Sequence, residues 1–232
     1  MKKILLRGVA ILIALIVFLS IYIYMFASNA KKVSTGAVIE QYENPNFALI
    51  VVDVQEATTG EYSMNPFYQE NSEELITKIN TLIEKFEAKE APVIYVQNQI
   101  EDPLINFFNS SFAKGSEGVK LDKRLKIVSD FIVPKDRQDA FSNPELDEIL
   151  IKHKVNKLYV VGLDAAYCIN STVKAANNRK YKITVIEEAV LSETDEQKGE
   201  FITQYKNSGY ENLGKLIVWD MIDKGDGQYA NG

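Results

Sequence analysis

An uninterrupted apolar stretch opens the chain, and shorter apolar runs recur after it. Residues 8–27 carry no charge and are long enough to cross a hydrocarbon core of about 30 Å as a helix. Further along, short runs rich in β-branched residues alternate with segments in which apolar residues recur every three or four positions. This alternation predicts an α/β fold with a doubly wound, six-stranded, mainly parallel sheet that carries helices on both faces.

Turn and capping residues place the expected elements along the chain. Strands are expected at residues 47–54, 92–97, 131–133, 158–162, 182–186 and 215–219. Helices are expected from Ser72, from Asn143 and Pro144 as N-cap and first turn, from Cys168, and from Thr194, which forms a capping box with Gln197. Residues 102–127 show no clear periodicity, so this segment is expected to be irregular.

The N-terminal apolar stretch is expected to be a single-pass membrane anchor. Three basic residues precede it and two follow, an excess that places the N-terminus inside and the rest of the chain outside the cytoplasm. Secretion after signal cleavage is the alternative, because residues 28–30 resemble a cleavage site, although the run exceeds the usual signal core of about 7–15 residues. The expected divisions are an anchor (1–30), a tether (31–45), a folded domain (46–222) and a polar tail (223–232).

The charge and the scarcity of cysteine and histidine narrow the classes of function. The net charge is −6, and the first thirty residues carry only basic charges. The domain is therefore acidic and nucleic acid is not expected as a partner, because phosphate binding needs a basic patch. Cys168 and His153 are the only residues of their types, which excludes an intrachain disulfide and metal sites built on several thiolates or imidazoles. His153 lies in a polar helix end and is expected at the surface.

Three chemically active side chains lie at or near the ends of expected strands. Asp53 lies at the end of the first strand, Lys135 directly follows the third, and Cys168 lies shortly after the fourth. The carboxyl ends of parallel strands meet at one edge of the sheet, where open α/β folds place their ligands. A carboxylate that shuttles a proton, a cation, and a thiol that attacks a carbonyl carbon can together perform acyl transfer.

Cys168 is expected at or next to the N-terminus of a helix. The unpaired N–H groups and the positive end of the helix dipole favour a thiolate there, which predicts a nucleophilic cysteine near neutral pH. The competing interpretation is an inert, buried cysteine that packs as a small hydrophobic residue.

Four motifs in order resemble the isochorismatase-like cysteine hydrolases, a family that includes nicotinamidases and N-carbamoylsarcosine amidases. The motifs are ALIVVDVQ, KGSEGVKLDKRL, VPKDRQDAFSNPELDEIL and VVGLDAAYCINSTVKAA. The resemblance implies a catalytic triad of Asp53, Lys135 and Cys168 that hydrolyses a small amide or carbamoyl compound through a thioester. The resemblance also implies that the protein self-associates. No metal or organic cofactor is expected, because the single His153 cannot supply the histidines that metal-binding nicotinamidases use.

The resemblance also implies the geometry around the cysteine. A cis peptide bond is expected between Leu163 and Asp164, and the backbone N–H groups of Asp164 and Cys168 are expected to form an oxyanion hole. Gln55 and Tyr167 are expected to line the substrate pocket.

Three positions depart from the family pattern and keep other functions open. Ala165 and Ala166 replace a threonine and an aspartate that often precede the cysteine, and Thr58 stands where an aromatic residue is usual. A non-catalytic binding or scaffold protein on the same fold is therefore one alternative. An ether hydrolase of the isochorismatase type, which does not depend on the cysteine, is another.

Overall fold

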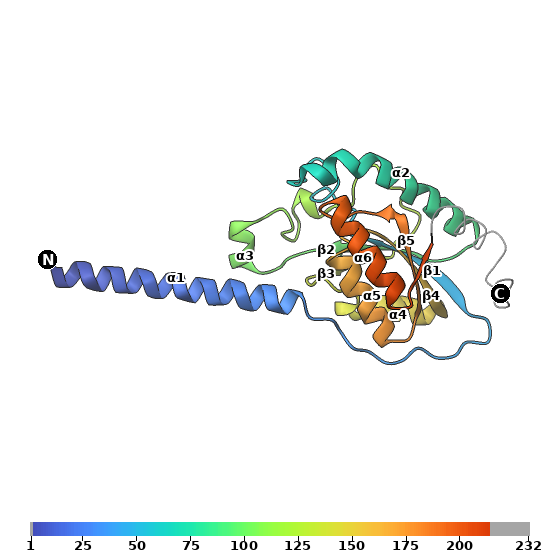
Figure 1. Cartoon of the computed structure of the whole chain (residues 1–232), viewed down its shortest axis with the longest axis horizontal. Coiled ribbons are helices and arrows are strands. Elements are labelled where there is room, and N and C mark those ends of the chain that lie inside the picture. Colours follow the sequence, from blue (N-terminus) through green and yellow to red (C-terminus); the bar gives the residue numbers. More distant parts are fainter. Residues whose placement is uncertain (1, 214–232) are drawn as a thin grey trace.

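Six parallel strands form the centre of the computed structural model, which describes residues 2–213 (Figure 1). The strands are β1 (Asn46–Val52), β2 (Val93–Asn98), β3 (Ile132–Lys135), β4 (Val155–Gly162), β5 (Lys182–Val190) and β6 (Glu211–Leu213). Their order in the sheet is β3-β2-β1-β4-β5-β6, and every pairing is parallel. The chain thus starts in the middle, winds outward to β3 and returns to the other side, which confirms the predicted doubly wound fold. The strand expected at 215–219 lies outside the described residues.

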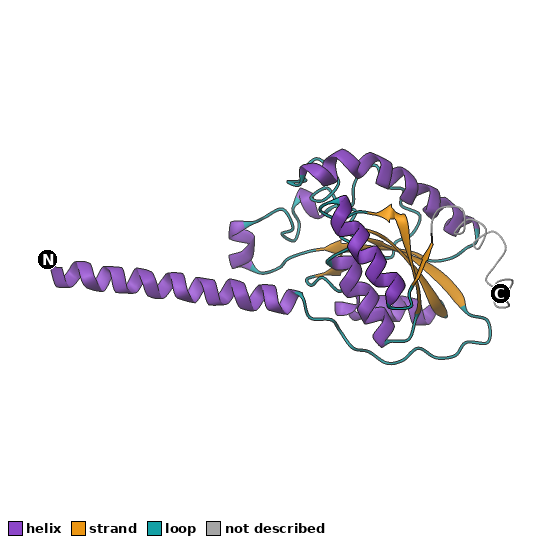
Figure 2. Ribbon diagram, viewed as in Figure 1, coloured by secondary structure: helices purple, strands orange, loops and turns teal. Residues whose placement is uncertain are grey.

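Helices cover both faces of the sheet, as predicted (Figure 2). They are α2 (Pro66–Ala88), α3 (Pro103–Phe108), α4 (Pro144–Lys152), α5 (Cys168–Asn178) and α6 (Asp195–Asn207), with short 3-10 turns at Glu117–Val119 and Ala140–Ser142. Because successive strand residues point to opposite faces, Ile50 and Val52 belong to the core under α4, α5 and α6. Leu49 and Val51 belong to the core under α2.

Helix α2 begins six residues before the predicted start, so that prediction was wrong. Its N-cap is Asn65, whose side chain accepts hydrogen bonds from the N–H groups of Phe67 and Tyr68, and Pro66 occupies the first helical position. Asparagine followed by proline is a stronger start signal than the acidic pair after Ser72, because it satisfies unpaired N–H groups directly. The segment expected to be irregular likewise contains α3, capped by Asp102.

Two other helix starts agree with the sequence-based prediction. The Asn143 side chain accepts a hydrogen bond from the N–H of Glu145 at 3.0 Å, and that of Thr194 accepts one from the N–H of Gln197 at 3.1 Å. The Gln197 side chain reaches back to the N–H of Glu193 at 3.2 Å. The predicted capping box therefore forms, except that the Gln197 side chain accepts from the N–H of Glu193 rather than from that of the N-cap residue Thr194.

The N-terminal helix α1 (Lys2–Ala30) projects away from the domain (Figure 1). Its apolar part has a mean hydropathy of 2.8 and no buried residue, so it is long and apolar enough to cross a membrane. The following segment, residues 31–45, has no regular structure but lies against the domain. Val33 and Ile39 pack against the core under α4, α5 and α6, and the Ser34 N–H donates to Asp139 at 2.7 Å. This segment is therefore a packed strap, whereas the sequence suggested only a short tether.

Candidate active site

Asp53 is held at the carboxyl end of β1 by its own backbone. Its φ of 54° lies in the left-handed region, which non-glycine residues adopt rarely and aspartate more readily than most. The Asp53 N–H donates to the carbonyl of Val96 on β2 at 2.9 Å, and the Asp53 carbonyl accepts from the Thr58 hydroxyl at 2.5 Å. Thr58 thus fixes the turn that aims the Asp53 carboxylate.

The structure brings Asp53, Lys135 and Cys168 together at the carboxyl edge of the sheet. The Lys135 Nζ lies 2.9 Å from Asp53 Oδ2 and 3.3 Å from Cys168 Sγ. The lysine side chain is completely buried and that of Asp53 nearly so. Asp53 Oδ1 is also buried and has no hydrogen-bond partner among the described residues. This oxygen is free to accept a proton inside the site.

The protonation states of Lys135 and Cys168 follow from their burial and from the charges around them. Burial alone lowers the pKa of Lys135, but the negative charge of Asp53 opposes this effect, so the pKa is raised and the amine stays protonated. Burial, followed by the charge of Asp53, raises the pKa of the Cys168 thiol to about 12 despite the opposing effect of Lys135. Helix α5 does begin at Cys168 as predicted. This direction is opposite to the one expected from the helix N-terminus, because desolvation and the carboxylate together outweigh the lysine.

A tight turn after β4 presents the cysteine. Gly162 has a φ of 110°, and a Cβ there would lie 2.0 Å from the Val52 carbonyl oxygen on β1, so only glycine fits. The peptide bond between Leu163 and Asp164 is cis, where the family resemblance placed it. Cys168 follows as the first residue of α5.

The Asp164 carboxylate is buried and ties this turn to the surrounding elements. Its Oδ1 accepts from the N–H of Ala166 at 2.5 Å and from Ser192 Oγ at 2.9 Å, while its Oδ2 accepts from the Tyr68 hydroxyl at 2.6 Å. Sequence reasoning assigned no role to Tyr68 or Ser192. The misplaced start of α2 left Tyr68 in a loop, and a lone serine after a strand carries no signal.

Two backbone N–H groups in the segment that presents the cysteine have no acceptor within the described part of the chain. Within residues 2–213, neither the N–H of Asp164 nor that of Cys168 donates a hydrogen bond. Unpaired N–H groups at the start of a helix are suited to stabilise a developing negative charge. An oxyanion hole formed by these two donors therefore stays a prediction.

The two expected pocket residues lie in different settings. Gln55 is fully buried, and its amide donates to the carbonyls of Asn98 at 3.1 Å and Val119 at 2.7 Å. Its Oε1 accepts from the N–H of Asn98 at 2.7 Å. Gln55 therefore joins β1, β2 and the segment before β3, and its engaged amide leaves no free group for a ligand, contrary to expectation. Tyr167 is the N-cap residue of α5 and is partly exposed beside Cys168.

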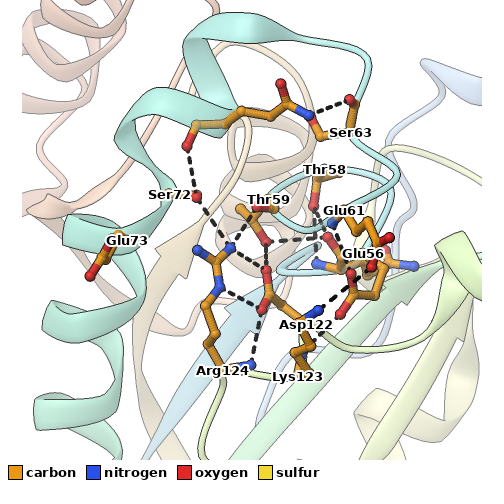
Figure 3. Close-up of polar contacts among 12 residues, drawn as sticks. Glu56, Thr58, Thr59, Glu61, Ser63, Ser72, Glu73, Asp122, Lys123 and Arg124 are labelled. Carbon is orange, nitrogen blue, oxygen red and sulfur yellow. Dashed lines mark hydrogen bonds and ion pairs between the residues drawn. The ribbon is translucent and has the colours of Figure 1, made fainter.

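A polar network fixes the loop that follows Asp53 (Figure 3). Asp122 accepts from the Thr59 hydroxyl at 2.8 Å and from Arg124 Nη2 at 2.7 Å. Glu56 accepts from the N–H groups of Lys123 at 3.0 Å and Glu61 at 2.9 Å. Burial alone raises the pKa of Asp122, but hydrogen bonds from Arg124 hold it below its ordinary value. The motif KGSEGVKLDKRL thus holds the loop that follows Asp53 through these hydrogen bonds, a role that the sequence did not reveal.

The described residues contain no group of three or more His, Cys, Asp or Glu side chains that could hold a metal ion. We therefore assign no residue to metal binding. A cavity of about 290 Å³ has Lys135 in its lining. A second cavity, of about 260 Å³, is lined among others by Thr58, Met64, Tyr68 and Asn109.

Comparison with known proteins is consistent with this geometry. The sequence model of the isochorismatase domain matches residues 47–213. The chain is 28% identical over 149 residues to an uncharacterized isochorismatase family protein of Bacillus subtilis, covering 63% of this chain and 78% of that protein. It is 28% identical over 145 residues to a secreted isochorismatase effector of Verticillium dahliae, covering 61% and 70%. The structure of N-carbamoylsarcosine amidase from Thermoplasma acidophilum superposes with a TM-score of 0.61 at 25% identity, covering 73% of this chain and 95% of that one.

Proposed function

Because the chain belongs to the isochorismatase family of hydrolases, we propose that it is a cysteine hydrolase that cleaves the C–N bond of a small amide or carbamoyl compound. The main support for the proposal is the arrangement of three side chains. The Lys135 ammonium contacts both Asp53 and Cys168, while the second oxygen of Asp53 is buried and unpaired. A thiol, a proton acceptor and a fixed positive charge are thus assembled in one largely buried site. The similarity to an N-carbamoylsarcosine amidase supports the choice of a C–N bond.

Acylation begins with the neutral thiol, because the pKa of Cys168 is raised to about 12. As substrate binds, Asp53 accepts the thiol proton and the sulfur attacks the carbonyl carbon, forming an S–C bond. The carbonyl oxygen gains a negative charge, which the N–H groups of Asp164 and Cys168 stabilise. Loss of one such donor typically costs about 3–4 kcal/mol in transition-state energy. The C–N bond then breaks, and Asp53 returns the proton to the departing nitrogen.

Deacylation repeats the same steps with water as the nucleophile. Asp53 removes a proton from water, the oxygen attacks the thioester carbon, and the C–S bond breaks. The proton returns to the sulfur, which restores the thiol and releases the carboxylic or carbamic acid. Lys135 stays protonated throughout and stabilises the negative charge as it moves between Asp53 and Cys168.

The N-terminal helix is part of the proposal. We infer that α1 remains attached as a single-pass anchor and holds the domain on the extracytoplasmic side, since its charge-free run is longer than the apolar core of a signal peptide. Intact-mass measurement of the membrane fraction tests this. A protein that retains Lys2 supports an anchor, whereas a soluble product that begins after Ala30 would show signal cleavage and secretion.

Amine release by the full chain in detergent micelles tests the chemistry. A panel of small amides that includes N-carbamoylsarcosine is screened, and the reaction of the best substrate is quenched in acid. We expect Cys168→Ala to lose at least 1000-fold in turnover, and we expect the wild type to carry the acyl mass on the peptide that contains Cys168. Lys174→Ala, an exposed change on the same helix, is the matched control and should keep full activity.

Other outcomes identify the alternatives. Full amide turnover by Cys168→Ala would exclude the cysteine as nucleophile. Cleavage of a vinyl ether that survives Cys168→Ala would favour an ether hydrolase of the isochorismatase type. No turnover of any amide, together with no reaction of Cys168 with acylating probes, would favour a binding or scaffold protein.

A further inference from the structure

Helix α3 presents an apolar surface to solvent. No residue of α3 is buried, and the side chains of Phe107 and Phe108 are 81% and 59% exposed. The two rings pack edge to face at 5.3 Å. Met64 is 83% exposed and lines the same cavity as Asn109, the residue after α3. We call Met64, Pro103, Phe107 and Phe108 the apolar rim. Bulky side chains grouped and exposed in this way mark a surface that contacts another phase or molecule.

The apolar rim lies at the level of the last turns of α1. The Tyr22 hydroxyl donates a hydrogen bond to the carboxylate of Asp102, the N-cap of α3. Tyr22 lies five residues before the end of the charge-free run at residue 27, which is about 7.5 Å along a helix. Tyr22 and Tyr24 are the kind of residue that marks a membrane interface. An anchored α1 thus puts the start of α3 close to the boundary between the hydrocarbon core and the lipid headgroups.

The angle between α1 and the domain is fixed by contacts rather than left to a loose linker. The carbonyl of Ala30, the last residue of α1, accepts from the N–H of Gln138 at 2.9 Å. The strap is bound next, because Arg179 donates to the Ser34 hydroxyl at 3.1 Å and the N–H of Ile39 donates to the Arg179 carbonyl at 2.9 Å. Arg179 itself is buried and paired with Asp147 at 2.8 Å.

The active site lies on the same side as the end of α1. Gln138, which binds Ala30, also accepts a hydrogen bond from Ser171, one turn after Cys168 on α5. Both α3 and the loop that contains Met64 follow strands at the carboxyl edge of the sheet, the edge that carries Asp53 and Lys135. In Figure 1 this edge faces the direction in which α1 extends.

We propose that the apolar rim docks on the lipid bilayer that α1 crosses, so that the active-site edge faces the headgroup layer. This rests on the proposed anchor and adds that the domain lies on the membrane. The acid beside α3, Glu101, is paired with Lys114 at 2.7 Å, which reduces its repulsion from the membrane. The substrate class that fits this orientation is an amide carried by an amphiphile at the membrane surface.

Fluorescence quenching in vesicles of phosphatidylcholine and phosphatidylglycerol tests the docking. In a Cys168→Ser background, which removes the native cysteine, single cysteines are introduced by Phe107→Cys, Ile151→Cys or Leu15→Cys and labelled with a polarity-sensitive dye. All three positions are exposed, and circular dichroism checks that each variant is folded. Ile151 is the matched control, since it lies at the far end of α4, toward the amino edge of the sheet.

Spin-labelled lipids should quench the dye at position 107 at least threefold more strongly than the dye at 151. Equal and weak quenching at 107 and 151, with strong quenching at 15, would overturn the docking and leave the anchor intact. A blue-shifted but unquenched dye at 107 would mean that a protein covers the apolar rim and would also overturn it. Weak quenching at 15 would instead refute the anchor. Because these proteins lack Cys168, no outcome depends on the proposed hydrolysis.

Discussion

Replacing Lys135 with methionine should destabilise the domain strongly, although it adds apolar surface to the core. The lysine side chain is 0% exposed and its Nζ lies 2.9 Å from Asp53 Oδ2. At an effective dielectric constant near 20, opposite charges at this distance attract by about 6 kcal/mol, which offsets the cost of burying both. Methionine has a similar volume, so the main consequence is a buried carboxylate without a partner.

Loss of one partner from a buried ion pair typically costs about 3–5 kcal/mol. For a domain of this size, that loss corresponds to a fall in melting temperature of roughly 10 °C. The pKa of Lys135 is raised by its partners despite burial, so the stabilisation by the pair is complete below the unfolded-state value of about 10.4 and is lost as the pH rises through the raised pKa. The difference between wild type and Lys135→Met should therefore be constant across neutral pH.

Thermal unfolding of the full chain in micelles, followed by circular dichroism, measures the effect. The double variant Asp53→Asn/Lys135→Met removes both charges and should recover most of the lost stability, because no buried charge is left alone. Lys120→Met breaks an exposed pair with Glu117 and should cost less than about 1 kcal/mol. A Lys135→Met protein that melts with the wild type, or a double variant whose loss equals the sum of the single losses, would refute the reasoning.

Three further predictions concern the site and its supports. The rate of Cys168 alkylation by a neutral electrophile should be low at neutral pH and should increase with pH, with an apparent pKa well above that of a free thiol, because burial and the charge of Asp53 raise the thiol pKa. Asp53→Asn should lower this apparent pKa. A wild-type pKa below about 8.5 would contradict the assignment. Gly162→Ala should destabilise the domain by more than about 3 kcal/mol, because the added Cβ would lie 2.0 Å from a carbonyl oxygen of β1. Gly199→Ala on α6 is the control: the site has open space around it, so the better helix propensity of alanine should raise the melting temperature. Tyr68→Phe removes a hydrogen bond to the buried Asp164 carboxylate and should cost about 1–3 kcal/mol in thermal unfolding; unchanged stability would mean that Asp164 is held without it.

The elements that the sequence predicted well are those with a strong local signal. The run from Ala48 to Val52 reads as a buried parallel strand on composition alone, because a strand covered on both faces needs apolar residues at every position. Asn143 and Thr194 start helices because their side chains satisfy N–H groups within the same turn. The start of α2 was missed because its buried residues begin only at Ser72, so the first turns from Pro66 lack an apolar period although Asn65 caps them.

Part of the candidate site was also predictable from the sequence. Asp53, Lys135 and Cys168 follow different strands, and the rule that parallel strands end at one edge is enough to bring them near each other. The motifs around them indicated the family. These conclusions depend only on chain order and on residue type.

Other properties depend on distances that only the folded chain sets. The sequence favoured a thiolate at Cys168, but burial and the charge of Asp53 raise the pKa of the thiol, and together they outweigh the lysine. Gln55 looked like a pocket residue, yet three backbone groups from distant segments occupy its amide. The contact of Tyr22 with Asp102 spans 80 positions, and no periodic pattern records it. Local sequence determines which elements form, whereas burial and long-range contacts decide the charge of each group and the surface that it faces.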